Sequence, residues 1–332
     1  MDVTGDVTER AGGARPKPGP VLVGYDGSPA SRLAVAWAAD EAARRGVPLA
    51  VAYAADYTGL IGGPFGASWL PDAVYEAAEG EASAGAAVAK DRHPQLDVTT
   101  HAYAGSPGDV LVRESRGCGL VVVGTRGLGE LAACIRGSVA SYVAAHALSP
   151  VVVVRGEGVV APGPGHPVVV AVDGTRASDA ALRFAVTTAQ ETGAPLTVAC
   201  AWLSALEDWT RAYWLAADPS QDPDKSAREA AERVAAAAGA RAESLAPGLA
   251  VDVHTRGGRP SEVILEIAGG DAGMVVVGSR GRGSVAGLLL GSVGHEVVHG
   301  ARCPVAVVRD DGEGSGTTSE DQADRSETVT PA

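Results

Sequence analysis

The chain has 332 residues, of which 46% are hydrophobic and 44 are glycine, and its net charge is −13 from 27 basic and 40 acidic side chains. This composition excludes fully disordered, collagen-like and disulfide-scaffold proteins, and an acidic body repels the phosphate backbone of nucleic acids. No apolar stretch approaches the roughly 20 residues that span a bilayer, and residues 1–20 lack an apolar leader segment. We therefore expect a soluble, cytoplasmic protein with no nucleic-acid or membrane partner.

Both ends of the chain are polar and lack apolar periodicity, and we expect both to be disordered. The segment from Asp310 to Ala332 holds seven acids and one arginine, so it contributes −6 and the rest of the chain −7. The four cysteines form no C-x-x-C pair, and we expect them to be buried as small hydrophobic residues. They are Cys118, Cys134, Cys200 and Cys303.

Strand and helix patterns alternate along the first half of the chain. Five short apolar runs, rich in β-branched residues, are predicted to be buried strands: 21–25, 48–54, 97–103, 119–124 and 150–154. Four longer segments between them are predicted to be helices: 30–45, 72–90, 108–116 and 137–147. This alternation predicts parallel βαβ units in a doubly wound sheet, whose ligands bind beyond the carboxyl ends of the strands.

The second half repeats the first. Residues 21–54 return at 168–201, an offset of 147, and residues 120–155 return at 274–309, an offset of 154. Two copies in one register predict two like domains. The predicted organisation is a disordered segment 1–19, a first domain 20–156, a linker 157–166, a second, similar domain 167–310 and an acidic disordered tail 311–332.

A short acidic motif follows the first strand of each copy. It reads Asp26-Gly27-Ser28 in the first copy and Asp173-Gly174-Thr175 in the second. The carboxylate can accept hydrogen bonds from an amine or hydroxyl of a ligand. Alternatively, it stabilises only the amino-terminal end of the following helix.

A glycine-rich motif follows the fourth strand of each copy. Gly124-Thr125-Arg126-Gly127 is followed by nine residues and then Gly137-Ser138, and Gly278-Ser279-Arg280-Gly281 is followed by nine residues and then Gly291-Ser292. Glycines let backbone amides point into one concavity, and a helix amino terminus adds partial positive charge, so the motif indicates phosphate binding. Ser138 and Ser292 would add hydroxyl donors while capping their helices. The alternative is an ordinary glycine-rich loop with a serine N-cap.

Other nucleotide-binding motifs are absent. No G-x-x-x-x-G-K-[ST] sequence occurs, which excludes a Walker-type ATPase. Gly281-Arg282-Gly283 follows the fourth strand rather than the first and does not complete G-x-G-x-x-G, so a dinucleotide-binding fingerprint is not supported.

With these motifs and the closing CPVAVVR strand, the sequence resembles the universal stress protein family, in particular its tandem two-domain members of the ATP-binding type. The resemblance covers about Val21 to Arg309. It implies two Rossmann-like, doubly wound parallel five-stranded sheets of order 3-2-1-4-5, with ATP or ADP, with or without Mg, in each domain. It also implies that 151–154 and 305–308 pair within the chain, as a built-in dimer; a homodimer is a further expectation.

The resemblance also implies site residues. The aspartates would hold the adenosine end, the backbone at the end of the second strand would contact adenine, and the glycine-rich loops would bind ribose and phosphates. In the first copy these are Gly24, Asp26, Ala54, Gly124, Thr125, Arg126, Gly127, Gly129, Gly137, Ser138 and Val139. In the second copy they are Asp173, Ala201, Gly278, Ser279, Arg280, Gly281, Arg282, Gly283, Gly291, Ser292 and Val293.

The first copy departs from the family pattern. Glu130 lies in its loop, where a carboxylate repels phosphate, and Cys134-Ile135-Arg136 replaces the Leu288-Leu289-Leu290 of the second copy. Arg136 could offset Glu130. The first site is therefore the weaker candidate.

The last predicted helix of the second copy contains a sequence that matches a zinc-binding motif. His295-Glu296-Val297-Val298-His299 matches the H-E-x-x-H pattern of zinc hydrolases. The first copy has Ser141 and Ala145 at the two histidine positions, and the sequence offers no evident third ligand. We therefore interpret both histidines as partly exposed helix residues and expect no metal and no catalytic residue.

Three functions remain open on this sequence. The first is an ATP-binding regulator of stress response or growth arrest, acting through an unidentified protein partner, with hydrolysis slow or absent. The second is a nucleotide-hydrolysing or nucleotidyl-transferring enzyme, because the fold alone does not exclude catalysis. The third is a scaffold with vestigial sites.

Overall fold

The structure, a computed structural model, describes residues 19–55, 72–125, 138–155, 160–204, 224–281 and 290–310. Its first half contains five strands, β1 Val21–Tyr25, β2 Leu49–Ala55, β3 Val98–Ala104, β4 Leu120–Gly124 and β5 Val151–Val154. The second half contains β6 Val168–Ala171, β7 Leu196–Trp202, β8 Val251–Gly257, β9 Met274–Gly278 and β10 Val305–Val308.

Helices connect these strands, close to the predicted positions. In the first half they are α1 Pro29–Arg45, α2 Asp72–Arg92, α3 Pro107–Glu114 and α4 Ser138–His146, with a short 3₁₀ turn at Ser115–Gly117. In the second half they are α5 Arg176–Thr192, α7 Lys225–Leu245, α8 Pro260–Ala268 and α9 Ser292–Gly300. No described helix combines the length and apolar character that a membrane crossing requires.

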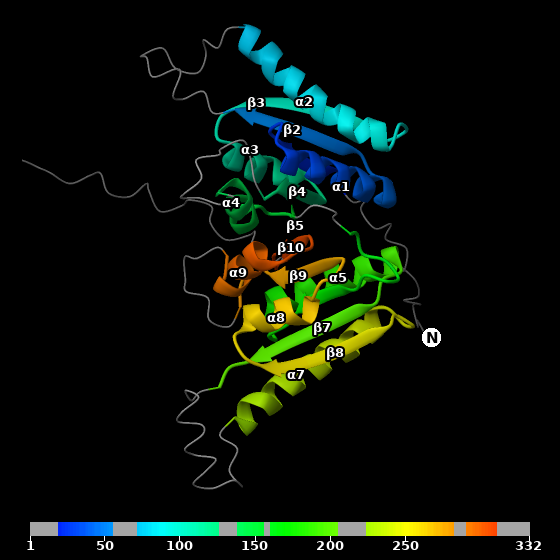
Figure 1. Cartoon of the computed structure of the whole chain (residues 1–332), viewed down its shortest axis with the longest axis vertical. Coiled ribbons are helices and arrows are strands. Elements are labelled where there is room, and N and C mark those ends of the chain that lie inside the picture. Colours follow the sequence, from blue (N-terminus) through cyan, green and yellow to red (C-terminus); the bar gives the residue numbers. More distant parts are fainter. Residues whose placement is uncertain are drawn as a thin grey trace, which may run out of the picture.

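The ten strands form one continuous sheet in the order β3-β2-β1-β4-β5-β10-β9-β6-β7-β8. Each half has the order 3-2-1-4-5 with parallel neighbours, so the predicted fold class is confirmed. β5 and β10 are adjacent and antiparallel, with Val152 opposite Ala306. Figure 1 shows these two strands at the middle of the molecule and β3 and β8 toward its opposite ends.

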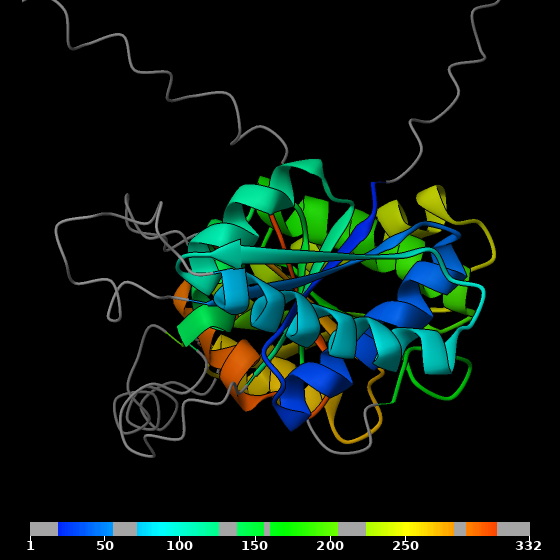
Figure 2. The same ribbon diagram turned by 90° about the horizontal axis from the view of Figure 1, so that it is seen from above.

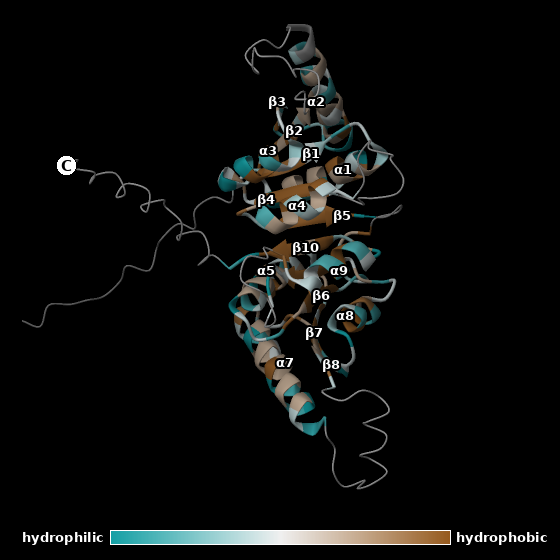
Figure 3. Ribbon diagram, turned by 90° about the vertical axis from the view of Figure 1, so that its left-hand side faces the viewer, coloured by the Kyte–Doolittle hydropathy of each residue, from teal (hydrophilic) through white to brown (hydrophobic). Residues whose placement is uncertain are grey.

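Helices cover both faces of the sheet, as the view from above shows (Figure 2). α1, α2, α5 and α7 contribute to one buried apolar layer, and α3, α4, α8 and α9 contribute to the other. The central strands are the most hydrophobic part of the sheet (Figure 3); all four residues of β5 and of β10 are buried. The chain changes face between β1 and β4 and between β6 and β9, which places the ligand-binding crevices of such sheets there.

Local sequence explains where the long helices start and stop. α1 starts after the N-cap Ser28, whose hydroxyl accepts from the Ser31 amide, and α5 starts after Thr175, which makes the equivalent bond. Both end at a glycine in the left-handed conformation, Gly46 with φ 65° and Gly193 with φ 66°.

Two predictions about burial were wrong. The third strand of the first half, 97–103, was expected to be buried, but β3 is mostly exposed because it is an edge strand, and its counterpart β8 at the opposite edge is equally exposed. The cysteines were also expected to be buried. Cys200 is buried, but Cys118 and Cys303 are half-buried. Burial raises the pKa of the Cys118 thiol and of the Cys303 thiol to about 11. Cys134 lies outside the described residues.

The two halves also touch away from the β5–β10 junction. An Arg44 guanidinium nitrogen on α1 lies 2.5 Å from a Glu191 carboxylate oxygen on α5. Arg155, just after β5, donates hydrogen bonds to the backbone carbonyls of Val298 and His299 at the end of α9. These bonds add polar contacts to the apolar strand junction.

Candidate functional site

The acidic motif forms the same tight turn in both halves. Gly27 and Gly174 both have φ 81°, a conformation that favours glycine. The Asp26 carboxylate accepts a hydrogen bond from the Ser28 amide at 3.0 Å. The Asp173 carboxylate accepts from the Thr175 amide at 3.0 Å and from its hydroxyl at 2.6 Å, through the same oxygen, Oδ1. One carboxylate oxygen therefore holds the turn.

The other oxygen of Asp173 faces the glycine-rich loop. A Cβ added to Gly281 would lie 2.8 Å from Asp173 Oδ2, closer than a side chain can approach without a shift. Gly281 belongs to the segment after β9, whereas Asp173 follows β6, the neighbouring strand. The fold thus brings the two predicted motifs of the second half into contact, with room between them for backbone only.

Backbone hydrogen bonds close the loop onto the start of α9. The Gly291 amide donates to the Ser279 carbonyl at 2.8 Å, and the Ser279 amide donates to the Val308 carbonyl of β10 at 2.8 Å. The first part of the glycine-rich motif and the helix that ends it are therefore fixed side by side.

The Ser279 side chain is buried without a hydrogen-bond partner. Its residue is 0% exposed, and its hydroxyl oxygen contacts no donor or acceptor among the described residues. Buried hydroxyl groups are almost always hydrogen-bonded in folded proteins, so this hydroxyl is suited to donate to a bound ion or ligand. The sequence predicted Ser279 as a site residue by its position, not by this property.

The amino terminus of α9 lies beside this loop. The expected Ser292 cap is wrong: Gly291 is the N-cap, with φ −68° and ψ 156°, and Ser292 is the first helical residue. A Cβ on Gly291 would lie 3.7 Å from the Gly281 amide nitrogen, an ordinary contact distance. The first-turn amides, including those of Ser292 and Val293, have no acceptor within the helix and are suited to an anion.

Other predicted glycines have a packing role. A Cβ on Gly278 would lie 2.9 Å from the Ala177 backbone, and a Cβ on Gly124 would lie 2.7 Å from the Ala30 carbonyl oxygen. Gly278 lets the start of α5 approach the end of β9, and Gly124 lets the start of α1 approach the end of β4. Gly24 likewise makes room for the Leu111 side chain of α3.

The remaining predicted residues lie at the same edge of the sheet or outside the described part. Ala54 and Ala201 are half-buried, one residue before the ends of β2 and β7. In the first half, Thr125 follows β4 and is half-buried, Ser138 is exposed at the start of α4, and Val139 follows it. The predicted residues outside the described part are Arg126, Gly127, Gly129, Gly137, Arg282 and Gly283, together with Glu130 and Arg136.

The histidine pair on α9 makes contacts of its own. The rings of His295 and His299 stack with centroids 4.3 Å apart, and His299 Nδ1 lies 2.8 Å from the His295 carbonyl oxygen. Glu296 accepts a hydrogen bond from the Ser261 hydroxyl. Burial, together with the charge of His299, holds the pKa of His295 below its ordinary value. Among the described residues, no three acidic, histidine or cysteine side chains are grouped to hold a metal ion.

The second-half site therefore combines features that suit a phosphorylated ligand. A helix amino terminus and the glycine-rich loop supply amides, Ser279 supplies a buried hydroxyl, and Asp173 supplies a carboxylate that faces the loop. Amides bind anions, whereas a carboxylate accepts from hydroxyl or amine groups. The arrangement fits a molecule with a phosphate at one end and a sugar or base at the other.

Comparison with known proteins places both halves in one family. The profile of the universal stress protein family matches residues 19–155 and 165–309. Universal stress protein Rv2005c of Mycobacterium tuberculosis is 33% identical over 87% of this chain and 96% of its own length. Universal stress protein Rv1996 of the same organism is 31% identical over 87% and 94%. The crystal structure of a universal stress protein from Archaeoglobus fulgidus covers 88% of this chain and 96% of its own, with a TM-score of 0.60 at 21% identity, and thus shares the fold.

Proposed function

Because the chain belongs to the universal stress protein family, we propose that it binds ATP or ADP and acts as a nucleotide-dependent regulator in stress response or growth arrest. Hydrolysis is slow or absent in this proposal, and regulation passes through a protein partner. The two halves act as a built-in dimer through β5 and β10.

One observation carries the nucleotide assignment: the contact between Asp173 and Gly281 beside the buried, unpartnered Ser279 hydroxyl. In the proposed complex Asp173 accepts from the ribose or base, and the Ser279 hydroxyl and the α9 amides contact the phosphates. Magnesium, where present, would accompany the phosphates.

A regulator is favoured over an enzyme by the groups around the loop. The glycine-rich loop and α9 offer amides and hydroxyls, which bind phosphate. Within α9, the titratable side chain nearest the amino terminus of the helix is that of His295. A catalyst would need a base positioned on a water or hydroxyl nucleophile. Binding without rapid turnover is the expected behaviour.

Thermal unfolding with and without nucleotide tests this proposal. At a ligand concentration a hundredfold above Kd, each occupied site stabilises the fold by about 2.7 kcal/mol, so ATP or ADP should raise the melting temperature. Gly291→Phe should remove that shift, because the phenylalanine side chain would fill the space beside the glycine-rich loop. A Cβ at this position makes only ordinary contacts, so the substitution itself should not clash with the backbone.

The matched control is Gly270→Phe, at a glycine in the same half with no atom near its Cβ position. It should keep the nucleotide shift. An unchanged melting temperature with ATP, ADP and AMP would refute nucleotide binding. Steady phosphate release by the wild-type chain, at more than a few turnovers per minute, would favour the enzyme instead.

A further inference from the structure

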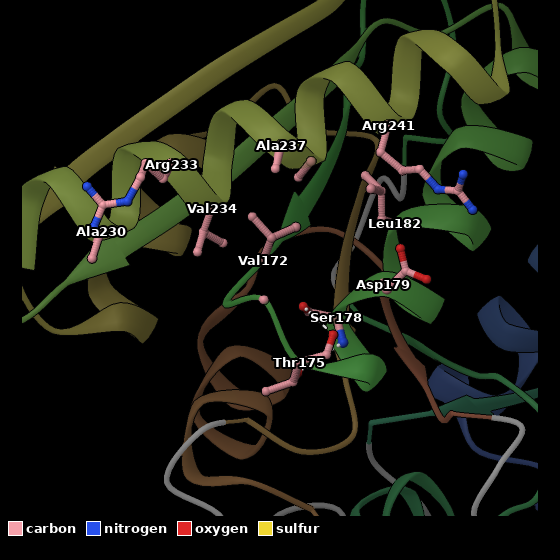
Figure 4. Close-up of a pocket in the computed structure, with 12 residues that line it drawn as sticks. Val172, Thr175, Ser178, Asp179, Leu182, Ala230, Arg233, Val234, Ala237 and Arg241 are labelled. Carbon is pink, nitrogen blue, oxygen red and sulfur yellow. Dashed lines mark hydrogen bonds between the residues drawn. The ribbon is translucent and has the colours of Figure 1, made fainter.

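A hollow lies between α5 and α7 of the second half, and at one end it reaches Gly174 and Thr175, next to Asp173. Its volume is about 600 Å³, within the range of small-molecule sites. Figure 4 shows Val172, Leu182 and Val234 projecting into the space between the two helices. Ala230, Ala237 and Ala238 extend the same apolar wall along α7.

The hollow has a cause in the sequence, because the first half fills the same place. Tyr25, at the end of β1, corresponds to Val172, and Gly85 of α2 corresponds to Ala238. In the first half a Cβ on Gly85 would lie 2.9 Å from Cγ of Tyr25, so the tyrosine ring packs directly against α2. Valine is much smaller than tyrosine, and among the described residues of the second half a groove lies in place of the ring.

Two arginines of α7 line this groove. Arg233 and Arg241 are eight residues apart, so they lie about 12 Å apart along the helix axis. Both are exposed, and neither makes an ion pair or hydrogen bond with any described residue. Their counterparts in α2 are Gly80 and Val88, so the charge is particular to the second half.

The other polar groups of the groove already have partners. Asp179 pairs with Arg183 one turn along α5. The Thr175 hydroxyl donates to Asp173, and the Ser178 hydroxyl donates to the Thr175 carbonyl. The groups left to contact a ligand are therefore the apolar wall of the groove and the two positively charged arginines at its rim. This positive charge lies in a chain whose net charge is −13.

We propose that this groove binds a small amphipathic monoanion, an apolar body of about ten carbons carrying one carboxylate or sulfonate. The apolar body lies against Val172, Leu182 and Val234, and the anionic group reaches Arg233 or Arg241. Two arginines so far apart do not converge on one polyphosphate, so this ligand differs from the nucleotide, although Gly174 and Thr175, which follow Asp173, also line the groove.

Fluorescence titration with 8-anilinonaphthalene-1-sulfonate, an apolar sulfonate, tests the proposal on the full chain. We expect saturable binding, displacement by decanoate, and at least tenfold weaker displacement by decylammonium. The double variant Val172→Tyr/Ala238→Gly transplants the first-half pair into the second half and should abolish binding. Arg233→Gln/Arg241→Gln should weaken it at least tenfold and remove the preference for the anion.

Lys225→Gln is the matched control, because it removes one positive charge from α7 outside the groove. It should bind the probe like the wild type. Equal probe binding by wild type and the tyrosine variant, or equal displacement by decanoate and decylammonium, would overturn the proposal. If the tyrosine variant fails to fold, as circular dichroism would reveal, the exposed arginine pair still decides the outcome.

Discussion

The glycines of the repeated motif have two different roles. The distance from a Cβ atom built at each glycine to its nearest neighbour distinguishes the two roles. At Gly278 and Gly124 the nearest atoms are backbone atoms of α5 or α1, at 2.9 and 2.7 Å, which cannot give way as a side chain can. At Gly281 the nearest atom is a carboxylate oxygen, and at Gly291 nothing lies closer than 3.7 Å. The first pair is required for packing and the second pair faces the proposed ligand.

Gly278→Ala should therefore destabilise the protein even without nucleotide. Its methyl group would overlap the Ala177 backbone, and overpacking of this kind costs about 1–3 kcal/mol. Urea denaturation without ligand measures the loss. Gly270→Ala, where nothing lies near the Cβ position, should change the free energy of unfolding by much less. Equal stability of the two variants would show that the loop moves to admit the methyl group.

At the residue scale the sequence predicted which residues gather at the strand ends but not what each one does. Recurrence of Asp26 as Asp173 and of Gly127 as Gly281 marked both motifs. The burial of Ser279 and the approach of Gly281 to Asp173 depend on how two distant segments pack, and no local pattern encodes that. The Ser292 cap was wrong because glycine and serine are both common N-caps, and Gly291 takes the role.

At the scale of elements, a charged cluster on α1 connects the helix to the second half. Glu41 is 9% exposed and accepts hydrogen bonds from Arg44 and Arg45, and Arg44 also contacts Glu191 of α5. Burial alone would raise the pKa of Glu41, but the hydrogen bonds and charges of the two arginines outweigh it and hold the pKa below its ordinary value.

Glu41→Gln should cost about 2 kcal/mol of unfolding free energy at pH 7, and the difference should shrink in acid. A carboxyl with a lowered folded-state pKa contributes stability above its unfolded pKa of about 4.3. That contribution is lost as the pH falls through the lower folded-state pKa. Denaturation curves between pH 7 and pH 3 measure it. Glu81→Gln, at an exposed position of α2, is the control and should show no such trend.

Element positions were largely predictable, because capping residues and glycines mark the ends of α1 and α5. The exposure of β3 and β8 was not. The strand at 97–103 was predicted to be buried, yet β3 and β8 are each third in their half and so lie at the edges of the sheet. Position in the sheet is a property of topology, and the polar residues within 98–104 and 251–257 were the available warning.

At the scale of the whole molecule, the junction of β5 and β10 makes the two halves one sheet. Val152 and its partner Ala306 are both 0% exposed, so the junction belongs to the core. The sequence resemblance implied which strands would meet. The continuity of a ten-stranded sheet and the polar bonds beside it required the three-dimensional arrangement.

We expect the two halves to unfold together. Val152→Ala removes two buried carbons and should lower the free energy of unfolding by about 1.5–3 kcal/mol, within a single calorimetric transition that shifts as a whole. Differential scanning calorimetry of the wild type and the variant checks this. Two separate transitions, of which only one moves in the variant, would show that the halves are independent.

The most direct test of nucleotide binding is an isothermal titration of the full chain with ATP, repeated on Gly281→Ala and on the control Gly270→Ala. We expect saturable binding by the wild type and the control. In Gly281→Ala we expect loss of the second-half site, or at least tenfold weaker binding there, because the methyl group would lie 2.8 Å from Asp173 Oδ2. No saturable binding of ATP or ADP at millimolar concentration, or identical binding by Gly281→Ala, would contradict this expectation.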